Sequence, residues 1–247
     1  MRRITTTMLA VTLVLALAAS GWGQGLMYMP WETISPETES TPSWTGFTGL
    51  VLTPTALIAP AQEISSFFHQ IRQADGNQEI YGATIGLLPS LEVGVARLSN
   101  VPQDTPDPSF ASETVLNVKY TANIGGLFNN PAAPQMAIGI YDASDQVNRV
   151  NYVVLSHSLG LSAGSTSVLP NMTLHVGYGN AEHDGGALDG LFGGIDFVPS
   201  RGLLAQIEHD GQDINGVLRY FPADWISLDV GVVKSEYGYG LSVKTPF

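Results

Sequence analysis

The sequence predicts an all-β fold: a single up-and-down antiparallel transmembrane β-barrel of about 12 strands, within a range of roughly 10–14. Three observations favour it. Charged residues make up 13% of the chain, against roughly 25% in typical soluble domains. A long series of alternating strand candidates follows residue 63. The last eleven residues alternate between an apolar, aromatic face and a small, polar face, and they end on Phe247.

Composition excludes several classes of function. The 247 residues carry a net charge of −12, which argues against nucleic-acid partners because phosphate binding needs clustered Lys and Arg. The chain has no cysteine, so disulfides, thiolate metal sites and thiol catalysis are ruled out. Low charge is compatible with a barrel in lipid, whose outer face is apolar and whose polar side chains point into the lumen.

The N-terminal segment predicts export. Arg2 and Arg3 precede an apolar run over residues 8–19, and small residues follow it, which is the pattern of a secretory signal peptide. The predicted organisation is therefore a signal peptide over residues 1–24, a flexible periplasmic leader over 25–45, and the barrel over 46–247. The barrel region begins with a short strand over 46–56 that ends in a Thr-Pro-Thr turn, because Pro cannot continue a central ladder.

The strand candidates have lengths that suit a bilayer. Most contain 8–10 residues, whereas a tilted spanning strand needs about 9–11 and globular strands average about 5–6. Alternation is clear in several, such as the last two, but candidates 64–73 and 149–158 do not show which face points outward. The candidates are 64–73, 78–87, 91–99, 113–122, 135–142, 149–158, 171–179, 190–198, 202–209, 213–220, 226–233 and 237–245.

The connections between candidates favour an up-and-down order. Three short turns that contain Pro89, Pro199 and Pro222 follow the second, eighth and tenth candidates. Even-numbered connections share one end of such a barrel, and outer-membrane barrels keep their short turns at the periplasmic end. The acidic stretch 100–112 follows the third candidate and is expected outside the cell. Connections 123–134 and 159–170 are longer than this scheme predicts.

Alternation also assigns side chains to the two faces. The inward set, which is the predicted functional set, consists of Glu92, Lys119, Asp196, Glu208, Arg219, Asp229 and Lys244. The outward aromatic residues expected near the membrane boundary are Tyr178, Phe197, Tyr220, Trp225, Tyr237 and Phe247. The outward residues of the last strand, which form the expected C-terminal signal for the outer-membrane assembly machinery, are Tyr239, Leu241, Val243 and Phe247. The sequence leaves open whether the lumen is a pore or is plugged.

A resemblance adds a candidate role. The segment Gly49-Leu50-Val51-Leu52-Thr53-Pro54-Thr55-Ala56 and the later pattern over residues 203–220 resemble the YjbH-type family of outer-membrane β-barrels. The resemblance implies an envelope role beside exopolysaccharide export or assembly, with polysaccharide or envelope export proteins as partners. Two features depart from the family: Leu57 stands where many members carry a basic residue, and members can be much longer than this chain.

Other functions find weaker support in the sequence. Hydrolysis of lipid or peptide would have to start from His157-Ser158, His175, His183-Asp184 or His209-Asp210, and no Gly-x-Ser-x-Gly elbow is present. Asp184, Asp189 and Asp196 do not follow calcium-loop spacing. We therefore expect a non-catalytic channel or scaffold in the outer membrane of a Gram-negative-type bacterium, without a metal or cofactor. A barrel hydrolase and a secreted soluble β-barrel that binds a small ligand remain the alternatives.

Overall fold

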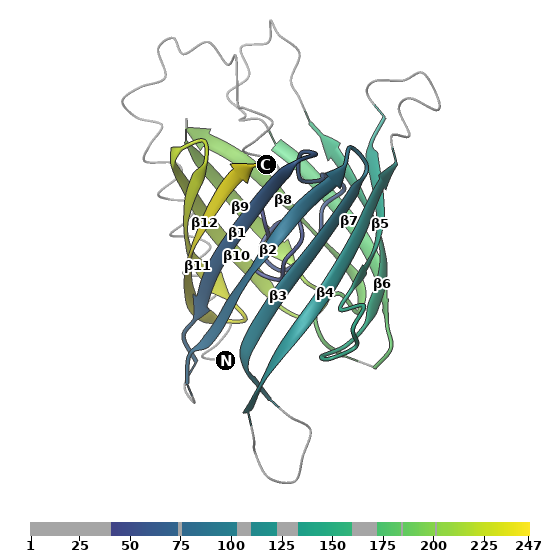
Figure 1. Cartoon of the computed structure of the whole chain (residues 1–247), viewed down its shortest axis with the longest axis vertical. Helices are drawn as coiled ribbons and strands as arrows, with labels where there is room; N and C mark the ends of the chain where they lie inside the picture. The colour runs from purple at the N-terminus through teal and green to yellow at the C-terminus, as the bar shows by residue number, and fades with distance from the viewer. Residues whose placement is uncertain are drawn as a thin grey trace, which may run out of the picture.

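A computed structural model describes residues 41–73, 76–102, 110–122, 133–159, 172–183, 185–200 and 202–247. The predicted signal peptide, and the expected leader up to residue 40, lie outside the described residues. Figure 1 shows a closed ring of tilted strands around a lumen that holds the first part of the described chain. No helix among these residues is both long and apolar enough to span a membrane.

Twelve antiparallel strands form the barrel wall, and each pairs with its neighbours in the sequence until β1 closes the ring against β12. The predicted fold class is confirmed. Predicted and observed boundaries differ by up to three residues, as where β4 starts at Phe110 instead of residue 113. The strands are β1 Glu63–Ile71, β2 Gln78–Leu88, β3 Leu91–Pro102, β4 Phe110–Ala122, β5 Gln135–Tyr141, β6 Val150–Ser158, β7 Met172–Ala181, β8 Gly190–Ser200, β9 Leu203–His209, β10 Ile214–Ala223, β11 Ile226–Val233 and β12 Glu236–Pro246.

The outer face of the wall is apolar. On β11 and β12 the side chains of Leu228, Val230 and Leu241 are exposed, with Val230 at 58%, while the residues between them point inward. A soluble protein would cover such a continuous apolar surface, whereas a barrel in lipid exposes it. Closure leaves no sheet edge, so the ladder pairs its backbone groups internally, as a hydrocarbon surrounding requires.

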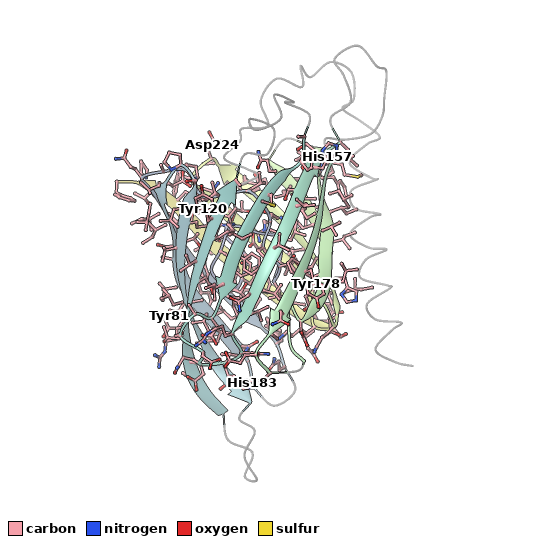
Figure 2. All side chains as sticks on the ribbon, turned by 90° about the vertical axis from the view of Figure 1, so that its right-hand side faces the viewer. Tyr81, Tyr120, His157, Tyr178, His183 and Asp224 are labelled. Carbon is pink, nitrogen blue, oxygen red and sulfur yellow. The ribbon has the colours of Figure 1, made fainter. Side chains whose placement is uncertain are left out.

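Exposed aromatic side chains lie toward both rims of the barrel. Tyr120, Tyr220, Trp225 and Phe247 share the rim at which β4, β10 and β12 end. Tyr81 and Tyr178 lie toward the opposite rim, and Figure 2 shows them on the other side of the wall's midline from Tyr120. This is the arrangement of aromatic girdles at two membrane interfaces.

Phe197 departs from the predicted girdle. Only 6% of this residue is exposed, because it packs against Ala205 together with the side chains of Met172 and Leu218. The expectation of an exposed aromatic at this position was wrong. The reason is local: the outward neighbour on β9 is an alanine, which leaves space that the larger side chain fills.

The three predicted turns that contain proline lie at the same rim of the barrel, and the strand register shifts at each of them. The strand register shifts between Gly86 and Leu88, between Phe197 and Ser200, and between Tyr220 and Ala223. In the last two cases the strand runs on through the proline, to Ser200 on β8 and to Ala223 on β10. A bulge accommodates a residue that has no backbone N–H to give to the ladder.

Residues 41–59, called the plug below, fold inside the barrel instead of joining its wall. Their backbone makes tight turns, with a bond from Ser43 N–H to the Phe47 carbonyl. Isolated bridges join Pro42 to Thr48 and Gly49 to Pro54. The short strand expected over residues 46–56 is therefore wrong, and residues 41–45 are buried in the lumen instead of forming a leader. In Figure 1 the plug is the dark purple segment inside the ring.

Candidate functional site

The candidate site is the lumen, where wall side chains meet the plug. All seven residues that the sequence assigns to the lumen are buried, with Arg219 completely so and Lys244 the most exposed at 8%. Five of them bind the plug directly: Glu92, Lys119, Glu208, Arg219 and Asp229. Buried charge is costly unless it is paired and hydrogen-bonded, so these contacts are what make a charged interior tolerable.

Glu208 on β9 holds the middle of the plug. Its carboxylate accepts bonds from the N–H groups of Val51, Leu52 and Thr53, at 3.0, 2.7 and 3.1 Å. The Thr53 hydroxyl donates to the same group at 2.8 Å. A concave run of successive N–H groups is a natural anion site. Here the anion belongs to the wall, and the peptide segment closes around it.

Glu92 and Lys119 form a second anchor on β3 and β4. Lys119 Nζ lies 3.1 Å from Glu92 Oε1 and donates to the Thr48 carbonyl at 2.7 Å. Glu92 accepts from Thr48 N–H at 2.8 Å and from Ala59 N–H at 2.7 Å. The pair thus fixes the plug at its centre and at the point where the chain leaves for β1. Because both charges are neutralised and bonded, the pair can remain fully buried.

Arg219 on β10 binds the plug's carbonyl groups. Its two terminal nitrogens donate to the carbonyls of Pro42 and Leu50, each at 2.8 Å. Its Nε donates to Gln206 at 2.8 Å, and Asp229 lies 3.7 Å away. The planar guanidinium presents several donors in a fixed fork, so one side chain can hold two parts of the plug in register.

Trp44 of the plug packs against the neighbouring sector of the wall, formed by β11, β12 and β1. Its ring stacks on His69 at a centroid distance of 4.6 Å and an angle of 9°. The indole N–H donates to Asp229 at 3.3 Å, and Nε2 of His69 lies 3.1 Å from the same carboxylate oxygen. The small inward residues of β12 explain the fit, because a Cβ at Gly240 would lie 1.8 Å from Cδ2 of His69.

Sequence reasoning missed several residues of the site. Asn117 donates to the carbonyls of Thr45 and Gly46, and Thr121 donates to the carbonyl of Ala56. Strand alternation placed Asn117 and Thr121 opposite the apolar face of their strand. Uncharged polar residues on an inner face are common, however, and without the plug nothing distinguishes these two from their neighbours.

A second missed feature is a relay across β6, β7 and β8. Ser156 Oγ lies 2.7 Å from His175 Nδ1, and His175 Nε2 lies 3.0 Å from Asp196 Oδ2. These residue types in contact are those of a hydrolytic triad. In this structure all three are buried, and the Ser156 oxygen accepts the N–H of Ala56 at 2.8 Å. The relay therefore fastens the plug, and the plug covers the serine.

The hydrolytic candidates named from the sequence do not form a triad with one another. His157 and Ser158 are exposed at the end of β6, and Ser158 contacts Thr173. His183 lies near the opposite rim, as Figure 2 shows, and His209 accepts a bond from Gly211 N–H in a turn. Among the described residues that the sequence offered for hydrolysis or metal binding, His175 and Asp196 are the pair that comes together across strands. Across the residues described, no group of three or more His, Asp or Glu is placed to hold a metal ion.

Comparison with known proteins identifies no family. No family model matches the chain, and no curated protein matches it. Among solved structures, the KdgM porin in complex with disordered oligogalacturonate is 14% identical, covering 74% of this chain and 99% of that one, with a TM-score of 0.45. The N-terminal β-barrel domain of Pseudomonas aeruginosa OprF is 9% identical over 75% and 98% of the two chains, with a TM-score of 0.23. The low-pH structure of Pseudomonas putida OprB is 10% identical over 74% and 91%, with a TM-score of 0.28.

Proposed function

We propose that this chain is a non-catalytic outer-membrane β-barrel of the channel type, closed at rest by its own plug. The exposed apolar wall and the two aromatic zones support insertion in a membrane. A closed β-sheet is one of the two backbone forms that can span lipid. The predicted signal peptide would export the chain, and the barrel could then insert in the outer membrane.

The observation that supports the closed state is that the buried charged side chains of the wall bind the backbone of the plug. Glu208 and Arg219, from adjacent strands, bind the N–H and C=O groups of the plug. Glu92 and Lys119 do the same from another sector of the wall. An open pore of this size would leave such charges hydrated by lumen water. Here the plug takes the place of that water.

Planar-bilayer recording of the refolded chain tests this proposal. The wild-type barrel is expected to insert and to remain closed, with current appearing when the plug is weakened. The chain has no cysteine, so the double substitution Ala56→Cys and Ser156→Cys can join plug and wall at a site where they already touch. The oxidised form should stay closed under every condition. Large, stable wild-type currents that this crosslink leaves unchanged would refute the proposal.

Catalysis is the second candidate, because Ser156, His175 and Asp196 lie in hydrogen-bond contact. The plug's N–H occupies the serine oxygen, and a substrate carbonyl would have to approach that same atom. The closed structure therefore favours an anchoring role for the relay.

A role in exopolysaccharide export or assembly is the finer proposal, and it rests on the resemblance of the plug sequence, residues 49–56, to YjbH-type proteins. Within this segment, residues 50–53 are the ones that Glu208 and Arg219 bind. Disrupting the gene in its host should reduce secreted polysaccharide, and a copy carrying the Ala56–Ser156 crosslink pair should fail to restore it. Unchanged polysaccharide in the disrupted strain would leave the barrel proposal intact and remove this one.

A further inference from the structure

The plug is fastened unevenly around the barrel. Its hydrogen bonds go to inward side chains on β3, β4, β6, β9 and β10, and the Trp44 indole adds one to β11. On β11, β12, β1 and β2 the inner face instead carries a row of hydroxyl groups, called the hydroxyl patch below. Its members are Ser227, Ser242, Ser65 and Thr84.

The four hydroxyls are neighbours across the sheet. Ser227 is directly opposite Ser242, and Ser65 is directly opposite Thr84. Ser242 and Ser65 are diagonal neighbours, because Ser242 pairs with Phe67 and Ser65 pairs with Lys244. The patch thus runs across four adjacent strands, in the half of each strand nearer the rim where the chain ends. It ends near Asp229, two residues along β11 from Ser227.

The closed state leaves these hydroxyls unsatisfied. Each of the four is at most 3% exposed, and none has a hydrogen-bond partner. One Asp229 oxygen and the hydroxyls of Thr41 and Thr55 on the plug are also buried without a partner. A polar group that is sealed from water and unpaired destabilises the state that seals it. These unpaired groups therefore weaken the contact between plug and wall in this sector, where Trp44 packs against His69.

We infer that the plug separates from the wall along the hydroxyl patch, and that the gap takes small uncharged molecules that carry several hydroxyl groups. Separation here parts Trp44 from His69 and Asp229. It breaks none of the bonds to Glu92, Glu208 or Arg219, so the plug remains attached on its other side. A hydroxyl both donates and accepts, so an incoming polyol satisfies the serine and threonine groups without bringing a charge into the lumen.

This inference rests on the proposed function, because a path past the plug matters only in a barrel that spans a membrane. Its test uses single cysteines in the otherwise cysteine-free chain, refolded into vesicles. Ser242→Cys probes the patch and Thr173→Cys is the matched control, a buried hydroxyl position on the inner face of β7, beside the strand whose Ser156 binds the plug. The probe is methyl methanethiosulfonate, which is small and uncharged. The cysteine at position 242 should react about tenfold faster, which corresponds to a local opening easier by roughly 1.4 kcal/mol.

A second measurement follows solute entry. Vesicles that contain the wild-type barrel should swell in erythritol, and the double variant Ser227→Val, Ser242→Val should lower the swelling rate about tenfold, since it removes two hydroxyls from the path. Equal thiol reactivity at positions 242 and 173, faster reaction at 173, or unchanged erythritol entry in the double variant would overturn the inference. Free passage of ions through the wild-type barrel, with both cysteines reacting fast, would instead overturn the closed barrel itself.

Discussion

The indole ring of Trp44 lies directly against the bare backbone of Gly238. A Cβ on that glycine would be 2.5 Å from two ring carbons of the tryptophan, far inside van der Waals contact. The glycine on β12 and the tryptophan of the plug therefore depend on each other, although 194 positions separate them in the sequence. The small inner face of the last strand provides the space into which the plug fits.

Gly238→Val should displace the plug's aromatic end. Overpacking at a filled site costs about 1–3 kcal/mol, and the rigid ring is already stacked on His69. We expect current in planar bilayers and a changed fluorescence from Trp44, while the barrel remains folded. Gly216→Val on β10 is the control for adding a side chain to a strand, because a Cβ there would lie in ordinary contact, 3.7 Å from the Gln206 carbonyl oxygen. Trp44→Ala in the Gly238→Val background should relieve the clash.

Glu208→Ala should loosen the middle of the plug more than any other single change in the wall. The substitution leaves the N–H groups of Val51, Leu52 and Thr53 without their acceptor, and each unpaired group costs about 1–3 kcal/mol unless water reaches it. Frequent channel openings are the expected result. Glu208→Gln keeps one acceptor oxygen and should give an intermediate opening frequency. Silent recordings from a folded Glu208→Ala barrel would contradict the role given to this carboxylate.

Much of the wall could be predicted from the sequence, because strand alternation is a local property. Leu228, Asp229 and Val230 already show which side chains point to lipid and which to the lumen, and the structure places them so. The plug could not be predicted in this way. Its residues have no periodicity. Its contacts join distant parts of the chain that come together only when the barrel has closed, as Trp44 and Asp229 do across 185 positions.

The relay of Ser156, His175 and Asp196 also could not be predicted, because its contacts depend on how adjacent strands are paired. Adjacent strands bring Ser156 and His175 face to face, and no short motif marks a pair set by strand register. The sequence directed attention to the neighbouring His157 and Ser158, which are both exposed. A one-residue difference on a strand moves a side chain to the other face, so His157 points away from this cluster. Ser158 shares the face of Ser156 but lies at the end of β6, where it contacts Thr173.

Ser156→Ala should affect closure and not catalysis. The serine oxygen accepts from Ala56, so its loss leaves one plug N–H unpaired, at a cost of about 1–3 kcal/mol. The expected phenotype is a modest rise in channel opening. The wild-type barrel in detergent should not hydrolyse nitrophenyl esters of short or long acyl chains above the level of a Ser156→Ala sample. Hydrolysis that disappears in this variant would assign the relay to catalysis after all.

Val230→Arg should test the lipid-facing side of the wall. Val230 is exposed near the middle of β11, where an arginine in the bilayer midplane costs about 2–4 kcal/mol. The control is Thr245→Arg near the end of β12, where the same side chain costs roughly 0–1 kcal/mol. The measurement is the free energy of unfolding in vesicles by urea titration. Equal effects at the two positions would contradict a bilayer that surrounds the middle of the barrel wall.

Phe247→Ala should test the C-terminal strand as an assembly signal. Phe247 is 65% exposed at the rim, and its N–H is bonded to the carbonyl of Gln62, so the strand end is held while the ring is free. Removing the ring leaves the β1–β12 closure intact, because that pairing runs through backbone groups from Glu63 to Ile71. The variant should therefore refold as well as the wild type in detergent, yet accumulate less in the outer membrane of cells. Leu241→Ala, in the same outward row, is the companion variant. A Phe247→Ala protein that reaches the membrane at wild-type levels would show that the assembly machinery recognises something other than this residue.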